Sequence, residues 1–208
     1  KMKGGIFKRA IASCCQHVAT PVLSSSGLGI FRAFCSTSIA RARRANYFDM
    51  FGLSMEYSVD EKKLEQKFKA LQREFHPDNF HNSDEKDKIE IEDVSAEINI
   101  AYTTLRDARL RAIYLLELRD IDVDSEGRTD NNAALLMEVM EAREAIEEAG
   151  SQEELKQLRQ ANRSRIEEWT AQIETGFKEG NMEIVRQAID HLQYYNKIEE
   201  EIAERIEI

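Results

Sequence analysis

The chain has 208 residues, of which 33% are charged and 8% aromatic, and it contains 9 glycines and 2 prolines. This composition favours an all-α fold with room for one or two small domains. The net charge of −10 is unevenly spread: residues 1–45 hold 8 basic and no acidic residues, which leaves 21 basic and 39 acidic residues, or −18, for the rest. No apolar run reaches the ~18 residues that cross a bilayer, and no basic surface interleaved with aromatic residues follows the first segment. We therefore expect no membrane and no nucleic-acid partner.

The acid-free segment at the beginning of the chain is typical of a mitochondrial transit peptide. We predict such a peptide over residues 1–44 and a mitochondrial matrix location for the protein. Residues 32–36 resemble a matrix-protease site, which predicts cleavage after Phe34, and a cut near Arg43 and Arg44 is the alternative. The other interpretation of the whole segment is a disordered basic arm for nucleic acid or membrane.

The acidic body opens with a short apolar segment. Residues 47–53 predict one or two helical turns that end at Gly52. Ser58 and Glu61 then have the S-x-x-E spacing of a capping box, which predicts a second helix over about residues 59–75. The buried stripe of that helix follows helical periodicity and consists of Leu64, Phe68, Leu71 and Phe75.

Pro77 is the only proline in the acidic body, and it lies in the tripeptide His76-Pro77-Asp78. Proline fixes its own φ, lacks an N–H donor and disfavours the α conformation in the preceding residue, so the helix must end near Phe75. We therefore predict that His76 and Asp78 lie on a stiff loop, where they suit recognition of a partner and form no catalytic site by themselves. A third helix is predicted after the loop, antiparallel to the helix that precedes the loop. Its buried stripe consists of Ile91, Val94, Ile98, Ala101 and Leu105.

The remaining segments are also predicted to be helical. Residues 107–118 are apolar on most sides and predict a helix packed between neighbours, whereas the acidic residues 119–131 predict a linker. The helices expected after the linker cover about residues 132–149, 152–179 and 182–206. Their boundaries are marked by Gly150, Ser151, Glu154, Gly180 and Asn181. Such short connections favour an antiparallel three-helix bundle.

The helix before Pro77 has a basic face opposite its apolar stripe, formed by Lys62, Lys63, Lys67, Lys69 and Arg73. On an acidic body this face reverses the local sign of charge, which favours long-range attraction of an acidic partner. The alternative is an ordinary solvated helix face.

Together these motifs resemble a complete J-domain. The matching parts are residues 47–53, the basic helix, His76-Pro77-Asp78 and residues 98–105, in the order and spacing of that family. The resemblance implies that the loop and the basic helix dock on a DnaK-type chaperone and trigger its ATP hydrolysis. The residues implied in this contact are His76, Pro77, Asp78, Lys62, Lys69 and Arg73. Residues 106–108 depart from the many J-domains that have a proline at this point.

The segments behind the J-domain resemble HscB, the dedicated co-chaperone of iron-sulfur cluster biogenesis, over about residues 46–206. Helical periodicity in the first helix after the linker assigns to the bundle core a stripe of Leu135, Val139, Ala142, Ile146 and Ala149. A second apolar side faces away from that stripe. The resemblance implies that this side binds an ISU-type scaffold protein through Leu136, Met137, Met140, Glu141, Glu144 and Tyr194. The alternative is that this side packs on the J-domain of the same chain.

No metal or other cofactor is expected. Cys14 and Cys15 are adjacent and Cys35 is alone, so the paired C-x-x-C motifs of the zinc module in some animal HscB proteins are missing. His76 and His81 have no third ligand in the sequence around them. His191 is expected to be a surface or interhelical residue.

The predicted organisation is a transit peptide (1–44), a J-domain (45–118), a linker (119–131) and an HscB-like three-helix bundle (132–208). The resemblance implies a non-enzymatic co-chaperone that binds the scaffold, delivers it to a mitochondrial DnaK-type chaperone of the heat shock protein 70 family and stimulates its ATPase, thereby promoting cluster transfer. The alternative is a J-like structural subunit of a larger mitochondrial assembly. An enzyme is poorly supported because the body has no phosphate-binding glycine loop and no nucleophile-base pair.

Overall fold

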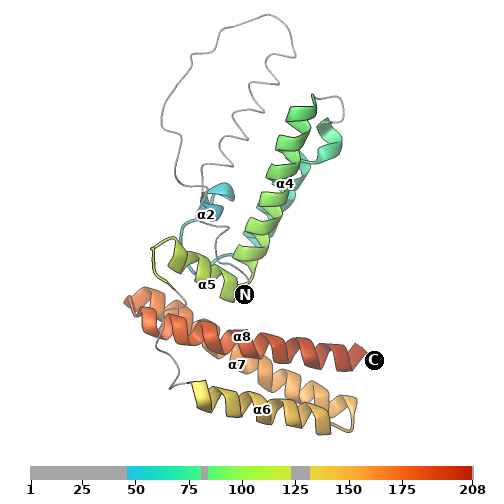
Figure 1. The fold of residues 1–208 in the computed structure, drawn as a ribbon, viewed down its shortest axis with the longest axis vertical. Coiled ribbons are helices and arrows are strands. Elements are labelled where there is room, and N and C mark those ends of the chain that lie inside the picture. Colours follow the sequence, from blue (N-terminus) through green and yellow to red (C-terminus); the bar gives the residue numbers. More distant parts are fainter. Residues whose placement is uncertain (1–45, 81–83, 123–131, 208) are drawn as a thin grey trace, which may run out of the picture. The chain divides into compact units, whose positions relative to one another are not determined.

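The computed structural model describes residues 46–80, 84–122 and 132–207. These residues form seven α-helices and one short 3-10 helix, and no strand occurs among them (Figure 1). The predicted all-α fold is therefore confirmed. The predicted transit peptide, all three cysteines, His81 and most of the predicted linker lie outside the described residues, and the division into domains stays a prediction.

Helix α2 (Tyr47–Met50) is a single turn held at both ends. The Asn46 side chain accepts a hydrogen bond from the Asp49 N–H at 2.9 Å, and Gly52 follows the turn with a φ of 59°, a left-handed conformation that glycine adopts without strain. The Tyr47 N–H donates to the Tyr114 hydroxyl at 2.9 Å, and the two rings stack with centroids 4.4 Å apart. The predicted short helix is thus present and anchored by aromatic packing.

The N-terminal cap of helix α3 (Glu61–Glu74) is Asp60, so the prediction that Ser58 caps this helix is wrong. The Asp60 carboxylate accepts a hydrogen bond from the Lys63 N–H at 3.1 Å. Asp60 directly precedes the first helical turn, and a carboxylate at this position also interacts favourably with the positive end of the helix dipole. Ser58 and Glu61 do have the S-x-x-E spacing, but the actual cap lies two residues after the one that this spacing predicts.

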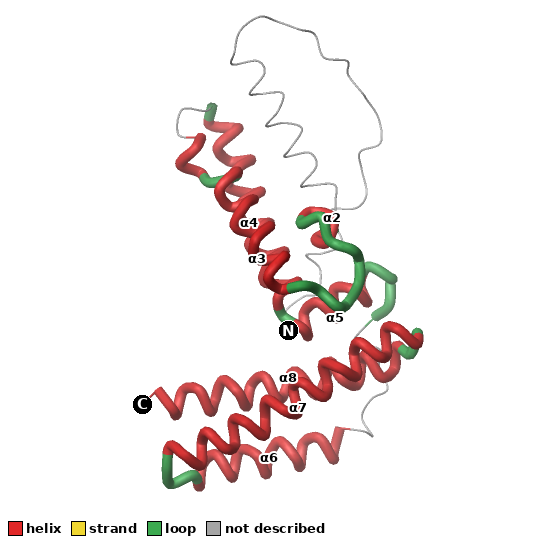
Figure 2. Tube along the Cα trace, turned by 180° about the vertical axis from the view of Figure 1, so that it is seen from behind, coloured by secondary structure: helices red, strands yellow, loops and turns green. Residues whose placement is uncertain are grey.

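Helices α3 and α4 (Glu85–Arg106) lie side by side (Figure 2). Their contact buries Leu64 and Phe75 of α3 almost completely, and Phe68 stacks on Tyr102 with ring centroids 3.9 Å apart. The whole predicted stripe of α4 is fully buried: Ile91, Val94, Ile98, Ala101 and Leu105. The predicted pair of antiparallel helices around the Pro77 loop is therefore confirmed.

Asp107 both ends α4 and begins α5 (Ala108–Glu117). Its N–H donates to the Thr103 carbonyl at 3.2 Å, and its carboxylate accepts from the Leu110 N–H at 2.7 Å. The buried guanidinium of Arg111 donates to the Leu105 carbonyl at 2.7 Å, which satisfies one of the carbonyls left unpaired at the end of α4. An aspartate and an arginine thus make the junction at which many J-domains have a proline.

The last three helices are α6 (Asn132–Glu148), α7 (Gln152–Glu179) and α8 (Met182–Glu207). The predicted cap of α7 is present: the Ser151 hydroxyl accepts from the Glu154 N–H at 3.2 Å. The Glu154 carboxylate accepts from the Gly150 N–H at 2.8 Å, one residue before the cap residue that a complete capping box would use. Gly180 ends α7 with a φ of 74°, as expected of a glycine at this position.

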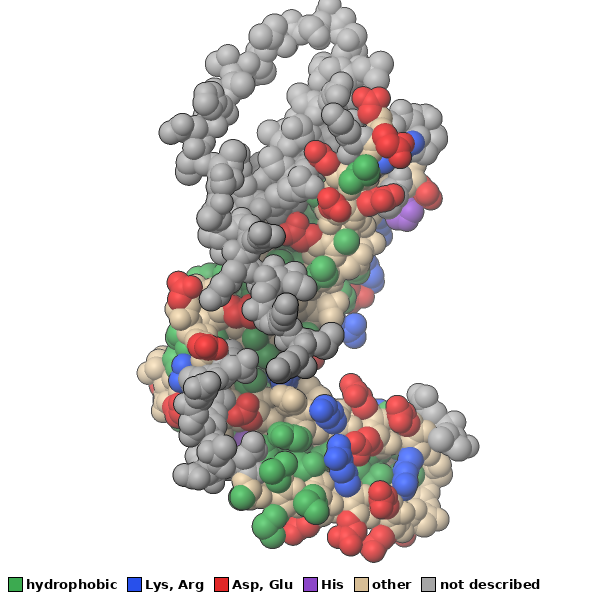
Figure 3. Space-filling view, viewed as in Figure 1, with side chains coloured by type: hydrophobic (Ala, Val, Ile, Leu, Met, Phe, Trp, Pro, Cys, Tyr) green, Lys and Arg blue, Asp and Glu red, His purple; other side chains and the backbone are tan. Residues whose placement is uncertain are grey.

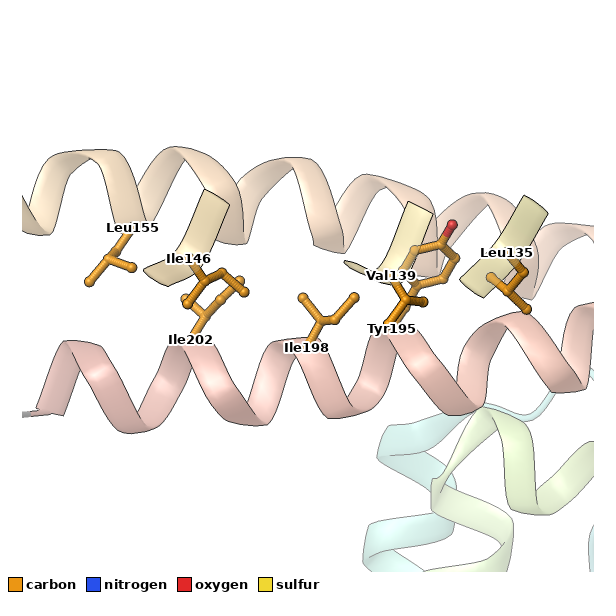
Figure 4. Packing of buried hydrophobic residues seen from close by; sticks show 7 residues of the cluster. All are labelled: Leu135, Val139, Ile146, Leu155, Tyr195, Ile198 and Ile202. Carbon is orange, nitrogen blue, oxygen red and sulfur yellow. The ribbon is translucent and has the colours of Figure 1, made fainter. Parts of the chain in front are cut away.

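All three helices contribute to one hydrophobic cluster (Figure 4), whose buried members are Leu135, Val139, Ile146, Leu155, Tyr195, Ile198 and Ile202. Ala142 and Ala149 pack against it, so the predicted core stripe of α6 is confirmed. Fully burying one large aliphatic side chain stabilises the folded state by about 1.5–3 kcal/mol. Burial of this cluster therefore contributes strongly to the packing of α6 on α8.

Candidate protein-binding sites

The first candidate site is the loop after α3. Helix α3 closes when the Phe75 N–H donates to the Leu71 carbonyl at 2.9 Å, and Phe75 itself is buried. The short helix η2 (Pro77–Phe80) then starts at the proline, as its fixed φ and missing N–H allow. The loop is therefore anchored at its base by a buried aromatic side chain and turned by Pro77.

His76 and Asp78 lie together on the surface of this loop. The His76 Nδ1 atom accepts a hydrogen bond from the Asp78 N–H at 3.3 Å and lies 3.7 Å from the nearer carboxylate oxygen of Asp78. The side chains are 54% and 91% exposed. In the neutral ring, acceptance at Nδ1 leaves the proton on Nε2, so the loop presents an imidazole donor and a carboxylate acceptor to a partner.

Asn79 also belongs to this site, although the sequence analysis did not single it out. Its side-chain amide donates to the Arg73 carbonyl at 2.7 Å, and its N–H donates to the His76 carbonyl at 3.0 Å. Asparagine readily bonds to nearby backbone groups in turns, and this was the signal available in the sequence. The first bond ties η2 to the last turn of α3, and the second closes the turn at His76.

The basic face of α3 is exposed along its length, as predicted, at Lys62, Lys63, Lys67, Lys69 and Arg73. Lys69 forms an ion pair with Glu65 at 2.7 Å, and the hydrogen bond from Lys69 holds the pKa of Glu65 below its ordinary value. Five basic and three acidic residues leave α3 with a charge of +2 in a body of −18. The reversed sign of charge therefore persists after the local ion pair is counted.

The second candidate site is the outward side of α6. Leu136, Met137 and Met140 are 43%, 64% and 70% exposed, and Glu141 and Glu144 beside them are exposed as well. Hydrophobic side chains gather over α6 on the face shown in Figure 3. This side of α6 is therefore exposed to solvent within the described residues. Methionine and leucine in such a patch supply adaptable apolar contact area.

Contacts between α6 and α8 set the level of Tyr194 along α6. Three pairs define the register of the two helices: Glu138 with Tyr195, Arg143 with Glu201, and the Ile146 carbonyl with Arg205. Their sequence separations of 57, 58 and 59 residues show that α6 and α8 run parallel with a nearly constant offset. The same offset puts Tyr194, which is half-buried against the core cluster, at the level of Leu136.

Arg143 and Glu201 border the patch and were missed by the sequence analysis. Two hydrogen bonds of 2.7 and 3.2 Å join the guanidinium to the carboxylate. Such a bidentate pair fixes direction as well as distance. A single arginine among five glutamates in α6 is the feature of the sequence that could have indicated an interhelical ion pair.

Within the parts of the chain that the structure describes, no group of three His, Cys, Asp or Glu side chains is placed to hold a metal ion. No helix in those parts is long and apolar enough to cross a bilayer. His191 is interhelical: its ring stacks on Trp169 with centroids 3.7 Å apart, and its buried Nδ1 atom has no hydrogen-bond partner in the described structure.

The fold places the chain with the HscB co-chaperones. The crystal structure of the human co-chaperone protein HscB superimposes with a TM-score of 0.72 and 28% sequence identity, covering 79% of this chain and 84% of that one. A structure of the chaperone HscB from Vibrio cholerae gives a TM-score of 0.70 and 32% identity, covering 78% of this chain and 98% of that one.

Sequence comparisons narrow the class to one family. A family model described as the HSCB C-terminal oligomerisation domain matches residues 131–203. A co-chaperone protein HscB homolog of Burkholderia mallei is 35% identical over 169 residues, which cover 78% of this chain and 94% of the relative. The chain therefore belongs to the HscB family. The iron-sulfur cluster co-chaperone protein HscB homolog of Arabidopsis thaliana is 33% identical over 77% of this chain, and the match spans 64% of that relative's length.

Proposed function

We propose that this protein is a co-chaperone of iron-sulfur cluster assembly that binds an ISU-type scaffold protein and delivers it to a mitochondrial DnaK-type chaperone, whose ATPase it stimulates. The observation that carries this proposal is the presence of two exposed sites on separate helical elements, one polar and basic, the other apolar with an acidic rim. The similarity to HscB co-chaperone relatives supports the role.

The chaperone contacts the loop and the basic face of α3 in this proposal. The contacting residues are His76, Pro77, Asp78, Lys62, Lys69 and Arg73. The lysines and Arg73 attract an acidic surface from a distance, whereas the exposed imidazole and carboxylate form short-range hydrogen bonds once contact is made. Since Asn79 anchors the loop to α3, both parts meet the chaperone in a fixed relation.

The scaffold binds the outward side of α6 with help from α8. The contacting residues are Leu136, Met137, Met140, Glu141, Glu144 and Tyr194. Burial of the two methionines and the leucine supplies most of the affinity, and Glu141 and Glu144 select a basic rim on the scaffold. The parallel register supports the inclusion of Tyr194 because it puts that ring level with Leu136.

The protein itself carries out no covalent step. It couples two binding events: α6 holds the scaffold while the loop engages the chaperone in its ATP-bound form. A ligand shifts an equilibrium only by its differential affinity for the two states, so the loop binds the hydrolysis-competent form of the chaperone more tightly than the other form. Hydrolysis then leaves the scaffold held by the chaperone, and cluster transfer follows.

The matrix location and the domain division are part of the same proposal. The acid-free residues 1–44 act as the transit peptide, residues 45–118 as the J-domain, residues 119–131 as the linker and residues 132–208 as the scaffold-binding bundle. Import of the full chain into isolated mitochondria, followed by N-terminal sequencing of the product, tests the location and the cleavage position together.

Two variants test the function by separating the sites. Asp78→Asn should abolish stimulation of the ATPase of a mitochondrial DnaK-type chaperone while leaving scaffold affinity unchanged. Leu136→Ser with Met140→Ser should weaken scaffold binding at least about tenfold, which is about 1.4 kcal/mol, while leaving the stimulation measured without scaffold unchanged. Undiminished stimulation by Asp78→Asn would refute the chaperone contact, and undiminished scaffold binding by the α6 variant would refute the scaffold site.

A further inference from the structure

The outer side of α4 carries a second exposed apolar stripe, separate from both sites above. Ile89 and Ile100 are 54% and 51% exposed, although the buried side of the same helix is completely inaccessible to solvent. The two isoleucines are 11 residues apart, or about three helical turns, and the exposed Ala96 lies between them on the same side. All three therefore point away from α3.

Exposed isoleucines have a cost in this position. Branching at Cβ lowers helix propensity, and an apolar side chain in water gains no burial energy. A residue that breaks a local rule without a gain in the folded chain indicates a role outside it. Two such residues aligned along one side of α4 favour an interaction surface over a random exposed side chain.

Acidic side chains border this stripe on both sides. Among the acidic side chains of α4 that the structure describes, Glu85, Glu90, Glu92 and Asp93 are exposed and Glu97 is half-buried. Figure 3 shows hydrophobic side chains over α4 with acidic side chains around them. The basic face belongs to the other helix of the pair, α3, so the two helices present charges of opposite sign to their surroundings.

We propose that this side of α4 binds a basic amphipathic helix of a partner protein. A helix laid along α4 would contact Ile89, Ala96 and Ile100 through apolar residues at i, i+4, i+7 and i+11 and pair its flanking Lys or Arg residues with the acids of α4. An acidic partner is disfavoured because it would bring like charges together. The acidic side of α4 thus suits a basic partner, whereas the basic face of α3 attracts an acidic one. This inference does not rest on the proposed function.

A synthetic amphipathic helix of leucine and lysine, with its leucines at those four positions, serves as the probe. In the full-length protein it should shift the backbone amide resonances around Ile89 and Ile100. Replacing both isoleucines (Ile89→Ser, Ile100→Ser) should weaken its binding at least tenfold at unchanged melting temperature, since both side chains are exposed. The control removes an exposed apolar side chain that belongs to none of the sites above (Met55→Ser, 50% exposed) and should leave the affinity unchanged.

Charge variants separate specific docking from general attraction to an acidic protein. Glu90→Gln with Glu92→Gln should weaken binding and flatten its dependence on salt, whereas Glu147→Gln with Glu148→Gln on α6 should have less effect. Equal losses from the two charge variants, wild-type affinity of the isoleucine variant, or equally tight binding of a peptide with glutamate in place of lysine would each overturn the proposal.

Discussion

The Tyr195 hydroxyl donates a hydrogen bond of 2.8 Å to the Glu138 carboxylate and thereby joins α8 to α6 below the exposed patch. Burial raises the pKa of Tyr195 to about 12, and Glu138 adds to the effect, so the hydroxyl stays protonated and remains a donor at all physiological pH values. Arg165 reaches the other oxygen of Glu138 at 3.2 Å. One carboxylate is thus shared by all three helices of the bundle.

Tyr195→Phe should lower the free energy of unfolding by about 1.5–3 kcal/mol, the usual value for a hydrogen bond to a charged group. Urea denaturation followed by circular dichroism measures it. Tyr194→Phe is the matched control, since the neighbouring hydroxyl makes no comparable bond to α6, and it should change stability by less than about 0.5 kcal/mol. Equal effects of the two changes would contradict the structural role of the bond.

Protonation of His191 should destabilise the bundle. Burial lowers the pKa of His191 from its ordinary value of 6.5, although Glu138 and Asp190 oppose the shift. The unfolded chain therefore binds the proton more readily than the folded one. The contribution of His191 to the free energy of unfolding is fully present above pH 6.5 and is lost as the pH falls toward the lowered pKa. Wild-type protein should therefore lose more stability between about pH 7 and pH 5 than His191→Phe does.

The single tryptophan gives a direct reading of the same event. Trp169 stacks on His191, so its fluorescence should titrate with a midpoint below 6.5, and His191→Phe should abolish this transition. His76→Gln, which changes the exposed histidine of the loop, should leave the transition unchanged. A midpoint at or above 6.5 would show that burial does not govern this residue.

Gly176 of α7 lies close to the start of α8. A Cβ atom added there would lie 2.7 Å from the Val185 side chain, which is shorter than packed atoms tolerate, and 3.0 Å from the Asn181 carbonyl, which is unusually tight. Gly176→Ala should therefore destabilise the bundle by about 1–3 kcal/mol in thermal or urea unfolding. Gly150→Ala is the control because its added Cβ meets nothing closer than 4.0 Å, and a larger effect at that position would contradict the packing.

The N-terminal cap of α3 can be tested with two neighbouring residues. Asp60→Ala should cost about 1 kcal/mol of stability because it removes the acceptor for the Lys63 N–H. Ser58→Ala should be nearly neutral, since Ser58 lies outside the helix. The reverse order of the two losses in urea denaturation would restore Ser58 as the cap.

The proposed contact between a DnaK-type chaperone and the basic face of α3 predicts a kinetic effect. Lys62→Glu with Lys67→Glu should slow association at low salt, and the difference from wild type should shrink as salt is added. Stopped-flow binding experiments at several salt concentrations measure the association rates of the wild type and the variant. Lys178→Glu, which changes an exposed lysine of α7, should associate at nearly the wild-type rate. An equal slowing by the control would assign the effect to net charge rather than to α3.

Periodicity and punctuation in the sequence were enough to predict the helices and most of the core. The stripes of α4 and α6 follow from spacing alone, and Gly180 and Ser151 end and begin helices as their chemistry predicts. Those features are local, so a single sequence contains them. The choice between Ser58 and Asp60 was also local, but two acceptable caps lay two residues apart and the spacing rule selected the wrong one.

Contacts between distant helices could not be predicted in this way. Nothing in the sequence pairs Arg143 with Glu201 or places Asn162, which is buried and donates to the Tyr195 carbonyl at 3.1 Å. These pairs depend on the rotation and register of whole helices, which only the packed cluster determines. The exposure of Leu136 and Met140 is likewise a property of the packed helices, since it depends on which side of α6 the bundle core covers.

The double role of Asp107 has a mechanical consequence. One residue closes α4 and opens α5, and Arg111 bonds back across the junction, so no slack segment separates the two helices. Helix α4 has 22 residues and is about 33 Å long, and the loop with His76 and Asp78 adjoins the end remote from Asp107. A rotation of about 5° at this junction would displace the loop by about 3 Å over that length.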